Sequence, residues 1–196
     1  MSKFVCPNCN GLVGFPETVC STGCGMIRHW EQREAEPHGV KAAMEAAAAL
    51  VQVIGSLWGT DSYETAVAHG ASSSMCQALI QPTLALLGYE SEVPSRIIDA
   101  GFKPDFVFES DGCSVMVEVE RGKTLDNNMD MLDMWKCHIH PRARHLILLV
   151  PIWYVKLKST GQRTQTATFA RVCRRMEPFF EVGNETNVRS LHVIGF

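Results

Sequence analysis

An Asp-Gly pair at residues 111–112, between two runs of strand-forming residues, is the feature that most constrains how this chain can fold. Asp-Gly is typical of the two-residue turn that joins adjacent antiparallel strands, because the central positions of that turn need a positive φ. We therefore predict a hairpin made of strands at residues 104–108 and 114–120. The short turn also sets the register of the hairpin, since it places Ser110 opposite Cys113.

The predicted register brings acidic residues to one face of the hairpin. Asp105 lies opposite Glu118, and Lys103 lies opposite Glu120. Directly opposed residues in an antiparallel pair point to the same face of the sheet, with their Cβ atoms about 5 Å apart. The other face of the hairpin is apolar and is expected to pack inward. It carries Phe106, Phe108, Val115, Val117 and Val119.

Three carboxylates that lie so close together need a compensating charge. They would otherwise repel one another, and an unpaired carboxylate is costly to bury. A divalent cation would remove the repulsion, since carboxylate oxygens are the ligands that Mg²⁺ prefers. A metal ion held in this way can activate water and stabilise charge on a phosphodiester. The alternative is a surface patch in which the acids form salt bridges with Lys103, Arg121 and Lys123.

The chain outside its first 35 residues alternates helix-like and strand-like segments. Helical spacing predicts helices at residues 36–57, 61–68, 73–87, 127–138 and 166–176. Further strands are expected at residues 89–93, 145–151 and 189–193. The run HLILLVP at 145–151 is typical of a central strand that is buried on both faces. This order of elements predicts an α/β fold, with a mixed central sheet flanked by helices.

The predicted helix at 127–138, with Asp126 as its N-cap, follows the acidic strand directly. Its core face is expected to consist of four apolar residues, which are Met131, Leu132, Trp135 and Ile139. Polar residues of the same segment are expected to line the cleft that holds the acids. These are Asn127, Asn128, Asp130 and Lys136.

Composition limits the classes of protein to which the chain can belong. Hydrophobic residues make up 46% and charged residues 20% of the sequence, as in globular domains. Lys41, Glu45 and Gly55 interrupt the most apolar stretch, so no span of the roughly 18 apolar residues that cross a bilayer is expected. The first residues lack the pattern of a signal peptide. We therefore expect a cytoplasmic protein without a membrane partner, in which cysteines do not form disulfide staples.

Four of the eight cysteines form two pairs near the N-terminus, in the sequences CPNC and CSTGC. Two such pairs separated by a loop match the tetrahedral site of a structural Zn²⁺ ion. The expected zinc ligands are Cys6, Cys9, Cys20 and Cys24. His29 is the other candidate for the fourth ligand, and free or disulfide-bonded cysteines are the alternative. The four remaining cysteines are scattered and are expected in the core.

Charge is distributed unevenly along the chain. Residues 1–140 hold nine Lys or Arg and 18 Asp or Glu, whereas residues 141–196 hold nine basic and three acidic residues. A basic segment beside an acidic cluster suits a metal site that acts on a polyanion, and a solvated helix face is the alternative. The expected contacts to nucleic acid are Lys156, Lys158, Arg163, Arg171, Arg174 and Arg175.

The sequence around the hairpin resembles the PD-(D/E)XK nuclease superfamily, which has the restriction endonuclease-like fold. The residues that carry the resemblance are Pro104-Asp105 and Glu118-Val119-Glu120, and the similar region covers roughly residues 60–155. The resemblance implies that Asp105 and Glu118 bind a catalytic metal ion. We accordingly divide the chain into a zinc-binding module at 1–35, a linking helix at 36–58 and a nuclease-like domain at 59–196.

Glu120 departs from the pattern of this superfamily, in which the corresponding residue is usually Lys. The resemblance implies that Glu120 is a further metal ligand or a base for the attacking water. Lys103 or Lys123 would then supply the positive charge that is missing at this position. The superfamily often adds an acid from its first core helix, for which Glu64 is the candidate.

These observations predict an endonuclease that uses Mg²⁺ or Mn²⁺ to hydrolyse DNA, in restriction, phage defence or repair. A homodimer or a larger defence or repair complex is expected, because nucleases that cut both strands commonly dimerise. One alternative is a catalytically inactive protein that keeps the nuclease fold and binds nucleic acid or assembles a complex. Another alternative is a zinc-ribbon DNA-binding regulator, in which residues 1–35 alone bind DNA.

Overall fold

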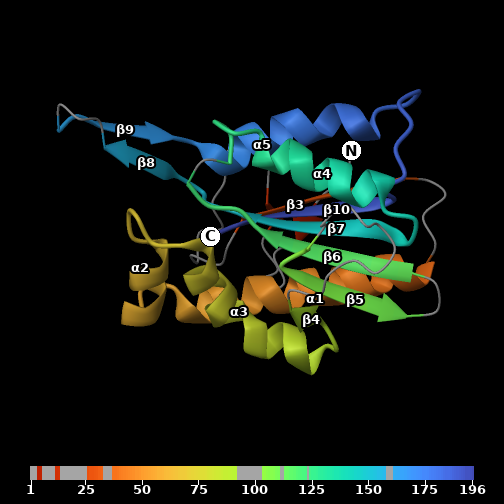
Figure 1. The fold of residues 1–196 in the computed structure, drawn as a ribbon, viewed down its shortest axis with the longest axis horizontal. Helices are drawn as coiled ribbons and strands as arrows, with labels where there is room; N and C mark the ends of the chain where they lie inside the picture. The colour runs from red at the N-terminus through yellow and green to blue at the C-terminus, as the bar shows by residue number, and fades with distance from the viewer. Residues whose placement is uncertain are drawn as a thin grey trace.

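A computed structural model shows a mixed α/β fold in which a six-stranded sheet lies between two layers of helices (Figure 1). The strands follow the order β3-β10-β7-β6-β5-β4 across the sheet. β7 pairs in parallel with both β6 and β10, and the remaining neighbours are antiparallel. The structure describes residues 4–5, 12–13, 26–32, 37–91, 103–110, 113–122, 124–157 and 161–196.

The strands of the central sheet come from both ends of the described chain. They are β3 (Met26–Glu31), β4 (Glu90–Ser91), β5 (Phe106–Ser110), β6 (Cys113–Val119), β7 (Ala143–Val150) and β10 (Ser190–Gly195). Two further antiparallel pairs lie outside this sheet. They are β1 (Phe4–Val5) with β2 (Leu12–Val13), and β8 (Tyr154–Leu157) with β9 (Arg163–Thr166).

The helices cover the two faces of the sheet unequally (Figure 1). One face is covered by α1 (Pro37–Leu57), α2 (Asp61–Val67) and α3 (Ser73–Leu86). The other face is covered by α4 (Met129–Ile139), α5 (Thr168–Met176) and the 3₁₀ helix η1 (Glu177–Phe180).

Alternation along β6 and β7 divides the interior into two cores. Val115, Val117 and Ile147 pack against the α1–α3 layer, whereas Met116 and Leu148 pack under α4 and α5. Both strands are buried on both faces, which is why HLILLVP is apolar throughout. The prediction of a buried central strand at this run is confirmed.

The predicted hairpin register is confirmed. Ser110 pairs with Cys113 and Phe106 pairs with Val117, in antiparallel strands without a bulge between them. The five predicted helices are also present, with ends that differ by a few residues. Asn128, rather than Asp126, precedes the first helical residue of α4, and it has a φ of 54°, which Asn tolerates better than most residues.

The segment expected to be a linking helix forms α1, and it is part of the core. Ala43, Leu50 and Val51 are buried against the sheet and α3. By length and composition alone, residues 38–57 of α1 could also cross a membrane, and 39% of that stretch is buried inside the domain. Its packing is that of a core helix in a soluble α/β domain. Residues 26–31, from the segment expected to be the zinc-binding module, form the edge strand β3.

The predicted core face of α4 is wrong for three of its four residues, whereas Met131 is partly buried and packs against the core. Leu132, Trp135 and Ile139 are exposed, with 57% of Trp135 accessible to solvent. The buried face instead carries two acids and two apolar residues, which are Asp130, Asp133, Met134 and Cys137. Helical spacing alone favoured the more numerous apolar residues, but the acids face the sheet because cationic side chains pair with them there.

Candidate active site

The hairpin places Asp105 and Glu118 side by side at the end of β5 and β6. The backbone N–H of Val119 donates to Oδ2 of Asp105 at 2.7 Å, and the N–H of Asp105 lies 3.4 Å from Oε2 of Glu118. Each carboxylate therefore lies against the backbone of the opposite strand. This mutual arrangement follows from the register that the Asp111-Gly112 turn predicts.

Helix α4 covers Glu118, which is only 3% exposed. The ammonium group of Lys136 reaches down from α4 and donates to Oε1 of Glu118 at 3.1 Å and to Oδ1 of Asp133 at 2.7 Å. The second of these is an i,i+3 ion pair within the helix. The alternative of a solvated surface patch is therefore wrong for Glu118, because the acidic face of the hairpin lies under a helix.

Two glutamates of this cluster hold their protons unusually tightly. Burial and repulsion from Asp133 raise the pKa of Glu118 to about 8, although Lys136 acts in the opposite direction. Burial and repulsion from Asp133 and Glu118 raise the pKa of Glu120 to about 9. At neutral pH the cluster consequently carries fewer negative charges than its number of carboxyl groups.

Asp133 and Lys136 stabilise each other's charged forms. Burial raises the pKa of Asp133, and the nearby ammonium of Lys136 partly offsets this effect. Burial by itself would lower the pKa of Lys136, but Glu118 and Asp133 outweigh it and the pKa is raised. Lys136 is therefore a permanent cation within the cluster at any physiological pH.

The donor set suits a hard divalent cation. Asp105, Glu118, Glu120 and Asp133 supply only carboxylate oxygens, the ligands favoured by Mg²⁺ and Mn²⁺. Oδ2 of Asp133 is buried and has no hydrogen-bond partner among the described residues. Within that part of the chain, no three His, Cys, Asp or Glu side chains are already arranged as ligands of one ion. Binding would thus require the side chains around Lys136 to adjust.

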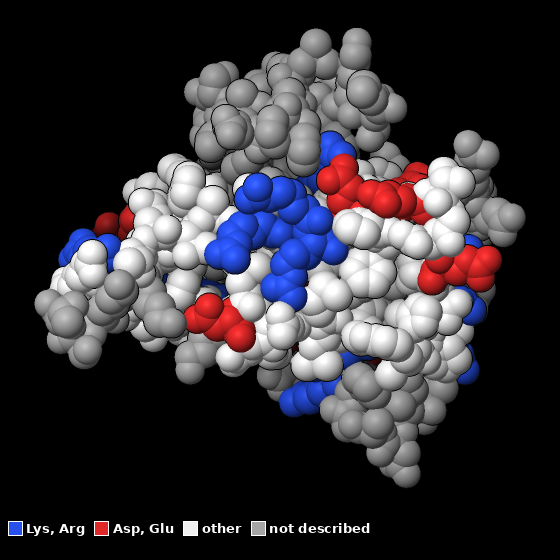
Figure 2. Space-filling view, turned by 90° about the horizontal axis from the view of Figure 1, so that it is seen from above, with Lys and Arg blue, Asp and Glu red and all other residues white. Residues whose placement is uncertain are grey.

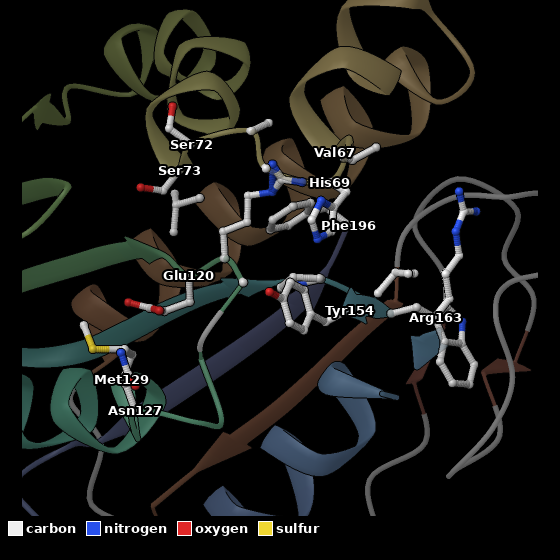
Figure 3. Close-up of a pocket in the computed structure, with 18 residues that line it drawn as sticks. Val67, His69, Ser72, Ser73, Glu120, Asn127, Met129, Tyr154, Arg163 and Phe196 are labelled. Atoms are coloured by element: carbon white, nitrogen blue, oxygen red, sulfur yellow. The ribbon is translucent and has the colours of Figure 1, made fainter. Parts of the chain in front are cut away.

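A cavity of about 830 Å³ opens beside the cluster, at the carboxyl ends of the parallel strands β6 and β7. Glu120 lies at its wall and links it to the acidic cluster (Figure 3). The loop between α2 and α3, the β8–β9 hairpin and Phe196 form further walls. Asn127 and Met129, at the start of α4, also line the cavity, as expected for Asn127. Ligands of α/β proteins commonly bind at this end of parallel strands.

The other expected catalytic residues are exposed or lie outside the described residues. Lys103 is exposed, close in sequence to Asp105. Glu64 is exposed on α2 and does not line the cavity. Lys123 lies outside the described residues, so its expected role stays a prediction.

The expected nucleic-acid contacts are divided among three places. Arg171 and Arg174 are exposed on α5, on the side of the molecule where Figure 2 shows basic side chains gathered. Arg175 is held in the structure, 3.3 Å from Oδ1 of Asp130 and 2.7 Å from Oδ1 of Asn128. Arg163 lines the cavity. Lys158 and the side chain of Lys156 lie outside the described residues.

The four expected zinc ligands lie outside the described residues, so the zinc site stays a prediction. His29, the other candidate ligand, lies in β3, where its ring stacks on that of His192 at 4.2 Å. The remaining cysteines form no disulfide bond and are buried, as expected for core residues. They are Cys76, Cys113, Cys137 and Cys173.

Asp133 is the functional candidate that sequence reasoning missed, while Lys136 was expected only as a cleft residue. Their i,i+3 spacing on the helix that follows the acidic strand was the available signal. No protein-family model matches this chain, and a search of curated proteins finds no significant match.

Proposed function

We propose that this protein is an endonuclease that hydrolyses phosphodiester bonds in DNA with Mg²⁺ or Mn²⁺. The observation that supports it most is the gathering of four carboxyl groups, two of which contact Lys136, beside an open cavity at the carboxyl ends of parallel strands. The resemblance at Pro104-Asp105 and Glu118-Val119-Glu120 agrees with this reading. Burying several carboxyl groups costs folding free energy, so a functional role explains the cluster better than chance does.

Each residue of the cluster has a proposed role. Asp105 and Glu118 would hold the metal ion, with Asp133 as a further ligand through its unpartnered oxygen. The ion would supply Lewis acidity toward the scissile phosphate. Glu120 reaches the cavity wall and, once deprotonated, would accept a proton from the attacking water. Lys136 would take the part that Lys usually plays at the position of Glu120, by stabilising negative charge.

The test is metal-dependent cleavage of plasmid DNA by the purified full chain. Asp105→Asn and Glu118→Gln each replace a carboxyl oxygen that would bind the metal ion with an amide nitrogen of the same size, so each is expected to lower the rate at least about 100-fold. Glu109→Gln is the control, since Glu109 is an exposed glutamate on β5 of the same hairpin, and its rate should stay within about twofold of the wild-type rate. Cleavage that survives both cluster substitutions would contradict the proposal.

The second candidate is a catalytically inactive protein of the same fold that binds nucleic acid or assembles a complex. The internal pairing of Glu118 and Asp133 with Lys136 favours it, because a buried ion pair is already satisfied without a metal ion. This candidate predicts DNA or partner binding, but neither cleavage nor Mg²⁺ binding. Calorimetric titration of Mg²⁺ into the wild type and Asp105→Asn separates the two candidates.

We also propose that residues 1–35 bind one structural Zn²⁺ through Cys6, Cys9, Cys20 and Cys24. The spacing of the two pairs supports this site. A cytoplasmic location agrees with the buried free thiols, since a reducing compartment keeps such groups unpaired. Cleavage of both DNA strands would require a second copy of the chain or a larger defence or repair complex.

A further inference from the structure

We propose that the cavity beside Glu120 binds unpaired nucleotides of a DNA strand, so that the substrate is single-stranded DNA or DNA with an unpaired segment. The claim that these nucleotides lie next to a reacting phosphate rests on the proposed nuclease function. The claim that they bind in the cavity is independent of that function, because it depends on the size and lining of the cavity.

The size of the cavity favours one or a few nucleotides. Its volume of about 830 Å³ lies within the range of roughly 300–1,000 Å³ that encloses drug-sized ligands. A nucleotide belongs to that size class. The bases of an intact duplex cannot enter such a space, because they must first leave the stack.

Aromatic side chains supply a stacking surface at one wall. Trp153 lines the cavity and is 55% exposed, and Tyr154, which also lines it, follows at the start of β8. In the view of Figure 3, Tyr154 lies between Glu120 and Arg163. The ring also lies over Gly122, where an added Cβ would be 3.7 Å from it. Rings that are exposed to a cavity bind bases of any sequence, since each base has a flat face.

Cationic groups in the same cavity suit the phosphates of that strand. Arg121 lines the cavity and donates to the carbonyl of Ala68 at 2.6 Å through Nη2, while its buried Nε and Nη1 have no hydrogen-bond partner among the described residues. Arg163 lines the cavity and is exposed. A guanidinium with two unused donors is well suited to a phosphate oxygen. Arg121 directly follows Glu120, so a phosphate bound there would lie near the acidic cluster.

The amino end of α3 adds to this preference for anions. Ser72 and Ser73 line the cavity, and the Ser72 side chain does not cap the helix. The amino end of this 14-residue helix, with the positive end of its dipole, therefore borders the cavity. Aromatic rings, two arginines and a helix end thus converge on one space, and together they match the alternating bases and phosphates of a single strand.

The experiment measures binding of the full chain to fluorescein-labelled dT8 and to a blunt 16-base-pair duplex, at one salt concentration and without added Mg²⁺. The wild type is expected to bind dT8 more tightly than the duplex. Trp153→Ala and Tyr154→Ala should each weaken dT8 binding about 10-fold, the value of one lost base stack. Trp135→Ala, an exposed tryptophan on α4, is the control and should leave dT8 binding unchanged. Circular dichroism verifies that each variant is folded.

Several results would overturn the inference. Equal affinity for dT8 and the duplex, or unchanged dT8 binding in both cavity variants, would mean that the cavity does not hold the strand. Tighter binding of rU8 than of dT8 would make RNA the ligand, and displacement of dT8 by micromolar dTMP would make it a site for free nucleotides.

The proposed nuclease function can fail separately from this inference. Asp105→Asn should abolish cleavage while leaving dT8 binding intact. If the wild type and all variants fail to cleave DNA but the cavity variants lose dT8 binding, the nuclease proposal fails and the cavity assignment stands. If Trp153→Ala and Tyr154→Ala cut single-stranded DNA as fast as the wild type does, the cavity assignment fails and the nuclease proposal stands.

Discussion

At the scale of single residues, the ammonium group of Lys136 links two acids of the cluster. Lys136 lies within 3.1 Å of Glu118 and 2.7 Å of Asp133, under a helix that keeps most water away. In the metal-free protein it neutralises part of the charge that a divalent cation would otherwise neutralise. The stability of the fold and the binding of metal are therefore coupled through this side chain.

Lys136→Met should lower the free energy of unfolding by about 3 kcal/mol, because it leaves buried carboxylates without a cation. Saturating Mg²⁺ should restore part of this loss if the cluster binds metal. Urea denaturation with and without Mg²⁺ measures both effects. Lys41→Met is the control, since the exposed pair between Lys41 and Glu45 contributes little. An equal effect of both substitutions would contradict the role given to Lys136.

Glu120→Gln should stabilise the protein at alkaline pH but not at pH 4. The pKa of Glu120 is raised from 4.5 to about 9, so the folded state retains a proton that the unfolded state releases. This group therefore favours folding fully below pH 4.5 and loses that contribution as pH rises toward 9. The difference in Tm between Glu120→Gln and the wild type should grow over this range. A difference that is constant with pH would mean that Glu120 is ionised in the folded protein.

At the scale of elements, the register of β5 and β6 was predictable because it depends on local turn chemistry and a period of two. The face of α4 was not, since its orientation depends on ion pairs with other elements, namely Lys136 with Glu118 on β6 and Asp130 with Arg175 on α5. β3 was also missed, because its pairing with β10 joins segments far apart in sequence. The apolar run of β7 indicated burial but could not identify its neighbours in the sheet.

Leu50→Ala tests whether α1 is a core helix. Leu50 is fully buried against the sheet, so its truncation should cost about 2–5 kcal/mol of unfolding free energy. Met44 lies on the same helix and is 51% exposed, so Met44→Ala should cost well under 1 kcal/mol. Chemical denaturation of the two variants measures the difference. Similar values for both would mean that α1 does not pack on the sheet in solution.

At the scale of the whole molecule, the acidic cluster lies between the sheet and α4, and the exposed arginines lie on α5 of the same helix layer. The cluster lies under α4, and Arg171 and Arg174 are exposed on the neighbouring α5 (Figures 1 and 2). An anionic strand could therefore contact α5 without entering the repulsive field of the carboxylates. The charge asymmetry of the sequence predicted a separation of this kind, but not its location.

Replacing Arg171 and Arg174 together by Gln should weaken DNA binding and reduce its dependence on salt. Each phosphate contact contributes about 0.7–0.9 to the slope of log K against log salt, so the slope should fall by about 1.5. Arg175→Gln should instead lower stability, because Arg175 pairs with the buried Asp130. Fluorescence anisotropy over a salt series measures the slope. An unchanged slope in the double variant would remove α5 from the binding surface.

The contacts that build the acidic cluster join residues that are close in sequence, whereas the contacts that close the sheet join residues that are far apart in sequence. The cluster's hydrogen bonds span at most 18 residues, but β3 pairs residue 26 with residue 195. Contacts of low sequence separation cost less chain entropy and tend to form first. The hairpin and α4 are therefore expected to come together early during folding. The reactive groups would then be assembled before the two ends of the chain complete the sheet.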